Sequence, residues 1–182
     1  MAFRLLLALC LAAPAWAAEV AGVKIDDKVR VADTELSLSG AGLRKRVIFQ
    51  VYAIGLYVRD PKADLISQPG PKRVLIHMLR DVGADTFTDA LIEGLKANHS
   101  EADYKALEPR VKELSDTMAQ IGEAKKDMVI ALDWTGGGTI LVVNGKPAGK
   151  PIAGEDFYKA LLRIWIGDKP VQDDLKKSLL GA

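Results

Sequence analysis

The sequence predicts an α+β fold in which helices pack on one side of an antiparallel sheet. Apolar residues alternate along the chain as far as residue 79, which predicts strands. Two segments with helical periodicity follow, and then a hairpin and two further helices. Repeated strand–helix–strand units are absent from the pattern, so a doubly wound parallel sheet is not expected. The length of 182 residues is that of one ordinary domain.

The N-terminal segment, residues 1–17, has the pattern of a secretory signal. Its single charge, Arg4, precedes an apolar run at 5–13 that is too short to span a bilayer. Ala15-Trp16-Ala17 then places small residues at the two positions that a signal peptidase reads. We expect cleavage after Ala17, a mature domain over residues 18–182 and a periplasmic protein; the alternative is a buried N-terminal helix.

The charge and cysteine content of the mature chain exclude several classes of function. Removal of residues 1–17 takes away Arg4 and Cys10, so 24 of the 25 basic residues remain against 24 acidic ones. Formal neutrality argues against a nucleic acid or an anionic membrane as partner, because both require a basic face. Without cysteine the mature chain has neither a disulfide nor a thiol nucleophile.

The strands are predicted in the first half of the chain. Residues 19–39 alternate and predict short antiparallel strands at a sheet edge, with Asp26-Asp27 as the first turn. Residues 46–58 are apolar on both alternating faces, which predicts a central strand covered on both sides, with Gly55 at a bulge or close approach. A loop rich in Pro and Gly at 60–72 precedes a further strand at 74–79.

The second half of the chain alternates helices with a hairpin. Residues 84–98 predict a helix capped by Asp85, and residues 101–121 predict another that Pro109 should kink or split. Strands at 128–134 and 139–144 form a hairpin, and Asn144-Gly145 turns into a last strand that ends near residue 152. Helices at 155–166 and 168–180 close the chain.

Catalytic and metal-binding motifs are weak. No serine stands in a nucleophile elbow, and two histidines without a mature cysteine give no zinc ligand set of known spacing. His77 shares a strand face with leucines and is interpreted as a core residue. His99 follows a helix and is interpreted as either a cap or a solvated residue. Gly40-Ala41-Gly42 lacks the third glycine of a dinucleotide loop. We therefore expect neither a metal nor a cofactor.

Two residues remain as candidates for a binding site. Arg44 stands at the start of the apolar strand, after a predicted turn at the glycine-rich residues 40–42, and Tyr52 lies further along that strand. A guanidinium beside an apolar cavity can bind a carboxylate or phenolate bidentately, and a phenol hydroxyl can add a hydrogen bond. The alternatives are that Arg44 is one of three clustered surface charges and that Tyr52 is a core aromatic whose hydroxyl is satisfied internally.

The segment LSGAGLRKRVIFQVYAIGLYV resembles the signature strand of the chalcone isomerase superfamily. FTDALIEG and the C-terminal DFYKALLRIWIGDKPVQDDLKKSLLG resemble its helices, and the match spans residues 36–181. The exported bacterial chalcone-isomerase-like proteins are the most similar group. The resemblance implies an open-faced β-sandwich, a large antiparallel sheet with helices on one face. In the superfamily that this chain resembles, plant enzymes close a flavonoid ring, whereas plastid relatives bind fatty acids through an Arg and a Tyr.

The resemblance transfers only part of the flavonoid site to this chain. The family arginine falls on Arg44 and the strand threonine of the enzymes on Tyr52. Their helix tyrosine falls on Phe87, which has no hydroxyl, and their asparagine on Gly94, which has no side chain. Ring closure requires such groups to position the substrate and its water, so this part of the comparison disfavours isomerase activity.

Three hypotheses follow from the sequence. The leading one is a non-catalytic protein that binds a fatty acid or a similar amphiphilic carboxylate, with Arg44 as the anion anchor, Tyr52 as a second donor, and Phe87 and Leu91 as apolar wall. The second is an intramolecular lyase or isomerase acting on a chalcone-like phenolic or enone substrate. The third is a periplasmic interaction module without a small ligand.

Overall fold

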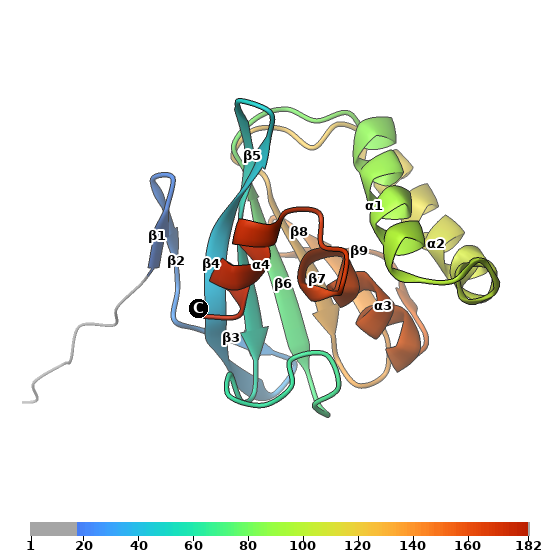
Figure 1. The fold of residues 1–182 in the computed structure, drawn as a ribbon, viewed down its shortest axis with the longest axis horizontal. Coiled ribbons are helices and arrows are strands. Elements are labelled where there is room, and N and C mark those ends of the chain that lie inside the picture. The colour runs from blue at the N-terminus through green and yellow to red at the C-terminus, as the bar shows by residue number, and fades with distance from the viewer. Residues whose placement is uncertain (1–17, 182) are drawn as a thin grey trace, which may run out of the picture.

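A computed structural model describes residues 18–181. The expected signal peptide, residues 1–17, lies outside this range. The structure contains a curled sheet of seven strands in which every neighbouring pair is antiparallel, in the order β3-β4-β5-β6-β7-β8-β9. The helices pack on one face of this sheet (Figure 1). The predicted α+β class and the one-sided helix layer are therefore confirmed.

The elements follow the chain in the order strands, two helices, strands, two helices. The strands are β1 (Ala18–Val20), β2 (Val23–Ile25), β3 (Lys28–Val31), β4 (Thr34–Arg46), β5 (Phe49–Val58), β6 (Lys72–Met78), β7 (Val129–Trp134), β8 (Thr139–Val143) and β9 (Lys146–Ile152). The helices are α1 (Ala84–Asn98), α2 (Glu101–Ile121), α3 (Glu155–Ile166) and α4 (Asp173–Leu179).

The N-terminal strands differ from the expectation in one turn. β1 and β2 form a separate hairpin whose turn is Ala21-Gly22, and both turn residues have positive φ, as a tight two-residue turn favours. Asp26-Asp27 instead links this hairpin to β3, where Asp27 accepts a hydrogen bond from the Leu38 backbone N–H. The prediction of Asp26-Asp27 as the first turn was therefore wrong.

The glycine-rich stretch 40–42 lies inside β4 and is not a turn. A β-carbon at Gly40 would overlap the backbone of α4 at Ser178 and Leu179, and one at Gly42 would lie 2.6 Å from the Leu175 side chain. The two glycines thus let α4 lie directly on the strand. The actual turn is Val47-Ile48, which joins β4 to β5. The strand expected at residues 46–58 therefore begins at Phe49. The turn residues Val47 and Ile48 are themselves apolar, so the sequence pattern did not distinguish them from the strand.

The helix predictions agree closely with the structure. α1, α2 and α3 have the expected bounds, whereas α4 begins at Asp173, later than expected. Asp85 does not cap α1, since the N-cap is Gly83 and no side chain bonds there. α2 is one helix through Pro109, so it is not split. Packing of the apolar stripe on α2 compensates for the backbone hydrogen bond that proline cannot make.

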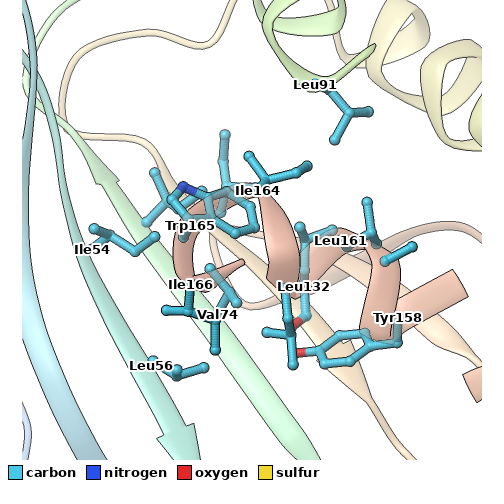
Figure 2. Close-up of a cluster of buried hydrophobic side chains, with 14 of the residues drawn as sticks. Ile54, Leu56, Val74, Leu91, Leu132, Tyr158, Leu161, Ile164, Trp165 and Ile166 are labelled. Atoms are coloured by element: carbon cyan, nitrogen blue, oxygen red, sulfur yellow. The ribbon is translucent and has the colours of Figure 1, made fainter. Parts of the chain in front are cut away.

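The apolar residues form two clusters on opposite faces of the sheet. The larger one lies between the sheet and the helices and includes Leu56, Val74 and Trp165. Figure 2 shows the α3 side chains of this cluster lying against those of β5, β6 and β7. The smaller cluster lies on the other face beneath the N-terminal strands and includes Ile25 and Tyr57. Among residues 18–181, no helix has the length and apolar character needed to cross a membrane.

Candidate ligand-binding site

A cavity of about 560 Å³ lies between the sheet and helices α1, α2 and α3. This volume is within the range of small-molecule sites, roughly 300–1,000 Å³. Most of its wall is aliphatic, from side chains of β6, β7, β8, α2 and α3. These residues are Ile76, Leu114, Met118, Ile121, Ile130, Leu132, Leu141, Val143 and Ile164. The wall is thus suited to an apolar chain or ring.

Arg44 lines this cavity from β4, and its neighbour across the hairpin is Tyr52 on β5. The two are directly paired, so they do not lie along one strand as expected from the sequence. The hydrogen bonds that Arg44 makes within residues 18–181 all leave from Nη1, to the carbonyl oxygens of Lys45 (2.8 Å) and Val171 (3.1 Å) and to Gln172 Oε1 (3.3 Å). The N–H groups of Nε and Nη2 remain for another acceptor.

Tyr52 is only 8% exposed and also lines the cavity. Its hydroxyl oxygen accepts a hydrogen bond of 2.9 Å from Trp165 Nε1. Burial raises the pKa of Tyr52, although the Trp165 bond and the nearby Arg44 guanidinium act in the opposite direction. The phenol therefore stays neutral, and within residues 18–181 no acceptor takes its proton. It can donate a hydrogen bond to an anion bound beside Arg44.

Phe87 and Leu91 of α1 line the same cavity, so the structure brings the four predicted site residues together. Figure 2 shows Leu91 on the α1 side, apart from the α3 side chains. Gly94 does not line the cavity. A β-carbon there would lie 2.8 Å from Ile164, so Gly94 instead permits close packing of α1 on α3. The absence of a polar side chain at this position thus has a structural reason.

The two histidines lie outside the cavity. His77 is half-buried on the other face of the sheet, beside Leu75, and burial lowers its pKa. His99 caps the end of α1, where its Nδ1 lies 2.8 Å from the Leu95 carbonyl oxygen. Within residues 18–181 there is no group of His, Cys, Asp and Glu side chains that could hold a metal ion.

Sequence reasoning missed the residues that fix Arg44 and Tyr52 in place. Trp165 lies within the helix expected at residues 155–166, but nothing local in the sequence indicated its bond to Tyr52. Gln172 accepts from the Lys45 backbone and donates to the Leu43 carbonyl oxygen, so it joins the start of α4 to β4 beside Arg44. These partners are 113 to 129 residues apart in the chain, and only the closed fold brings them together.

Comparisons with known proteins identify the family of the chain and solved structures with a similar fold. A family model described as chalcone isomerase-like matches residues 17–181. The crystal structure of an Arabidopsis thaliana fatty-acid binding protein is similar, with a TM-score of 0.71 and 15% sequence identity. The alignment covers 87% of this chain and 92% of the plant protein. At this identity the likeness concerns the fold. No curated protein matches the chain.

Proposed function

The chain belongs to the chalcone isomerase-like family, and from this premise we propose that it binds a fatty acid or a similar amphiphilic carboxylate without transforming it. The observation that carries the proposal is the pairing of Arg44 with Tyr52 at the wall of a largely apolar cavity. The charged side chains Arg46, Arg80, Asp81 and Glu93 also belong to its lining. The carboxylate would lie at the pair of Arg44 and Tyr52, and the hydrocarbon chain would extend along the aliphatic wall.

The donor arrangement suits a carboxylate. Arg44 offers Nε and Nη2, which form the fork that binds two carboxylate oxygens in parallel. Tyr52 would add a third, neutral donor, because its oxygen is already engaged by Trp165. The backbone and Gln172 bonds from Nη1 restrict the guanidinium before the ligand arrives, which lowers the entropic cost of binding.

The remaining wall supports binding rather than ring closure. Phe87 contributes an aromatic surface where the plant isomerases are expected to have a hydroxyl, and Gly94 is used for helix packing. Neither can hold a water or a phenolate. The fatty-acid binding protein with the similar fold is consistent with this interpretation.

The test is a titration with a fluorescent long-chain fatty acid, set against its alcohol analogue. Wild-type protein should prefer the acid, and Arg44→Met should lose this preference. Removal of charge-assisted hydrogen bonds, worth about 1.5–3 kcal/mol, corresponds to a roughly 10- to 150-fold weaker affinity. Tyr52→Phe should lower the affinity for the acid by roughly 2- to 12-fold, as expected for the loss of one neutral hydrogen bond.

Arg30→Met is the matched control, because it removes an exposed arginine from β3, away from the cavity. It should leave the affinity unchanged. Lipid extracted from the purified wild-type protein and analysed by mass spectrometry should contain a carboxylate absent from the Arg44→Met sample. Equal affinity of wild type for acid and alcohol would contradict the proposed anchor.

Export to the periplasm forms part of the proposal. It is supported by the signal pattern at residues 1–17 and by the family match, which begins at residue 17. Mass spectrometry of the protein from a periplasmic extract should give a chain that begins at Ala18. A chain that retains Met1 in the cytoplasmic fraction would contradict this part.

A further inference from the structure

The tip of the β4–β5 hairpin exposes large apolar side chains. Val47 and Ile48 form the two-residue turn and are 90% and 84% exposed, and the adjacent Phe49 is 52% exposed. The only other exposed large apolar side chain within residues 18–181 is that of Leu180, which is 43% exposed. A run of three exposed apolar residues at a projecting tip is unusual for a surface that contacts only water.

The requirements of the hairpin do not explain these residues. Val47 has a φ of 56°, in the left-handed region where a β-branched residue is strained. A two-residue hairpin turn in which only the first residue has positive φ, as here, favours Gly at that position, and Gly-Asn would fit without strain or apolar exposure. The tip therefore carries Val-Ile at a cost to folding, and such costs are characteristic of functional sites.

Basic side chains surround the tip. The exposed basic residues of the tip and of the two adjoining loops are Lys45, Arg46, Arg80, Lys125 and Lys126. The exposed acidic residues of the same segments are Asp81, Glu123 and Asp127. The guanidinium of Arg80 lies 4.4 Å from the centre of the Phe49 ring, which joins the loop after β6 to the tip. The net charge of the chain does not reveal this local excess of positive charge.

The tip adjoins the cavity. Arg46, Phe49 and Arg80 belong both to this exposed region and to the cavity wall. Figure 1 shows the hairpin projecting at one end of the sheet, beside the loops that lead from β6 to α1 and from α2 to β7. The exposed acidic residues of α1 are Asp85, Asp89 and Glu93, and Glu93 also lines the cavity. Apolar and basic groups thus coincide where the cavity meets the surface.

We propose that this tip docks on the surface of an anionic phospholipid bilayer. Val47 and Ile48 enter the boundary between headgroups and acyl chains, while Lys45, Arg46 and Arg80 face the lipid phosphates. This arrangement brings the cavity opening to the membrane. The inference goes beyond the proposed function, since it rests on the exposed tip and requires no bound carboxylate.

The experiment is co-sedimentation of the protein with vesicles of phosphatidylglycerol and phosphatidylcholine in equal parts. Wild type should bind these vesicles, bind pure phosphatidylcholine more weakly and dissociate as salt is added. Val47→Gly combined with Ile48→Asn should weaken binding roughly tenfold or more, because two aliphatic side chains that would be buried in the bilayer are lost. Lys45→Gln combined with Arg46→Gln should weaken it by roughly 25-fold at low salt, about fivefold for each charge.

Two control variants match these changes at other places on the surface. Leu180→Asn removes the other exposed apolar residue, and Lys146→Gln combined with Lys150→Gln removes two exposed charges from β9. Both should bind vesicles as wild type does. If they weaken binding as much as the tip variants, the contact is not at the tip and the proposal fails.

The Gly-Asn turn also separates docking from folding, because it should leave the thermal midpoint equal to or above that of wild type. In Ile48→Trp, the introduced indole should shift its emission to shorter wavelength on anionic vesicles; Trp134 and Trp165 are already buried. No binding by wild type, or an unshifted spectrum, would overturn the proposal. A dimer in ultracentrifugation that the Gly-Asn variant abolishes would also overturn it, since the tip would then contact a second copy.

These outcomes are independent of the carboxylate site. Val47 and Ile48 do not line the cavity, so the Gly-Asn variant should retain the affinity of wild type for the fatty-acid probe. Vesicle binding by a protein without affinity for the probe would refute only the proposed function. Probe binding by a protein that ignores vesicles would refute only the docking.

Discussion

Gly40 offers a sharp test of how the C-terminal helix is attached to the sheet. A β-carbon at this position would lie 2.8 Å from the carbonyl carbon and oxygen of Leu179 and closer still to the carbonyl oxygen of Ser178, whereas ordinary contact begins at 3.4 Å. The atoms that it meets are backbone atoms, so no side-chain rotation relieves the overlap. In Gly40→Ala the end of α4 must therefore withdraw from β4.

The loss of stability expected in Gly40→Ala has two parts. Overpacking of a well-filled region costs about 1–3 kcal/mol. Withdrawal also breaks the hydrogen bond of 3.1 Å from Ser39 Oγ to the Leu179 carbonyl oxygen, worth about 0.5–1.5 kcal/mol. Together they predict a free energy of unfolding lower by about 1.5–4.5 kcal/mol. For a domain of this size, the midpoint of thermal unfolding should fall by roughly 3–18 °C.

Urea and thermal unfolding followed by circular dichroism measure the effect, with two glycine variants for comparison. Gly42→Ala should cost less, because the Leu175 and Ser178 side chains that it meets can shift. Gly137→Ala should be nearly neutral, because a β-carbon there meets nothing within 4 Å. Gly40→Ala with a stability within about 0.5 kcal/mol of wild type would refute the reasoning.

Three further predictions concern single side chains. Trp165→Phe removes the N–H that orients the Tyr52 hydroxyl, so the fatty-acid probe should bind roughly 2- to 12-fold more weakly by fluorescence titration. Asp133→Asn breaks the bidentate ion pair with Arg73, in which both hydrogen bonds measure 2.6 Å. Urea unfolding should show a free energy of unfolding lower by about 2–3 kcal/mol. This is less than for a fully buried pair, because Arg73 is partly exposed. Burial lowers the pKa of His77 below its ordinary 6.5, so the folded state should lose stability as the pH falls from 6.5 through the lowered value. His77→Gln should remove this part of the pH dependence in urea unfolding, and an unchanged slope would show that His77 does not titrate as described.

The site was predictable in composition but not in geometry. Arg44, Tyr52, Phe87 and Leu91 were singled out from residue type, helical spacing and family resemblance, and they line one cavity. The sequence placed Arg44 and Tyr52 along one strand, because an unbroken apolar run from Val47 onward shows no turn residues. In the fold they face each other across the hairpin.

The sequence by itself determined the helices and the later hairpins, because their signals are local. Three of the four helices have the expected bounds, since apolar stripes at helical spacing define one buried face. Asn144-Gly145 likewise specifies its turn through its own backbone preferences.

Only the tertiary structure decided what Gly40, Gly42, Trp165 and Gln172 do. A glycine within a strand pattern predicts an interruption of the strand, yet here two glycines lie inside β4 and allow α4 to pack directly on it. The bonds that fix Arg44 and Tyr52 join segments more than a hundred residues apart. Such contacts arise only when the packed layers close, because local sequence preference carries no information about a distant partner.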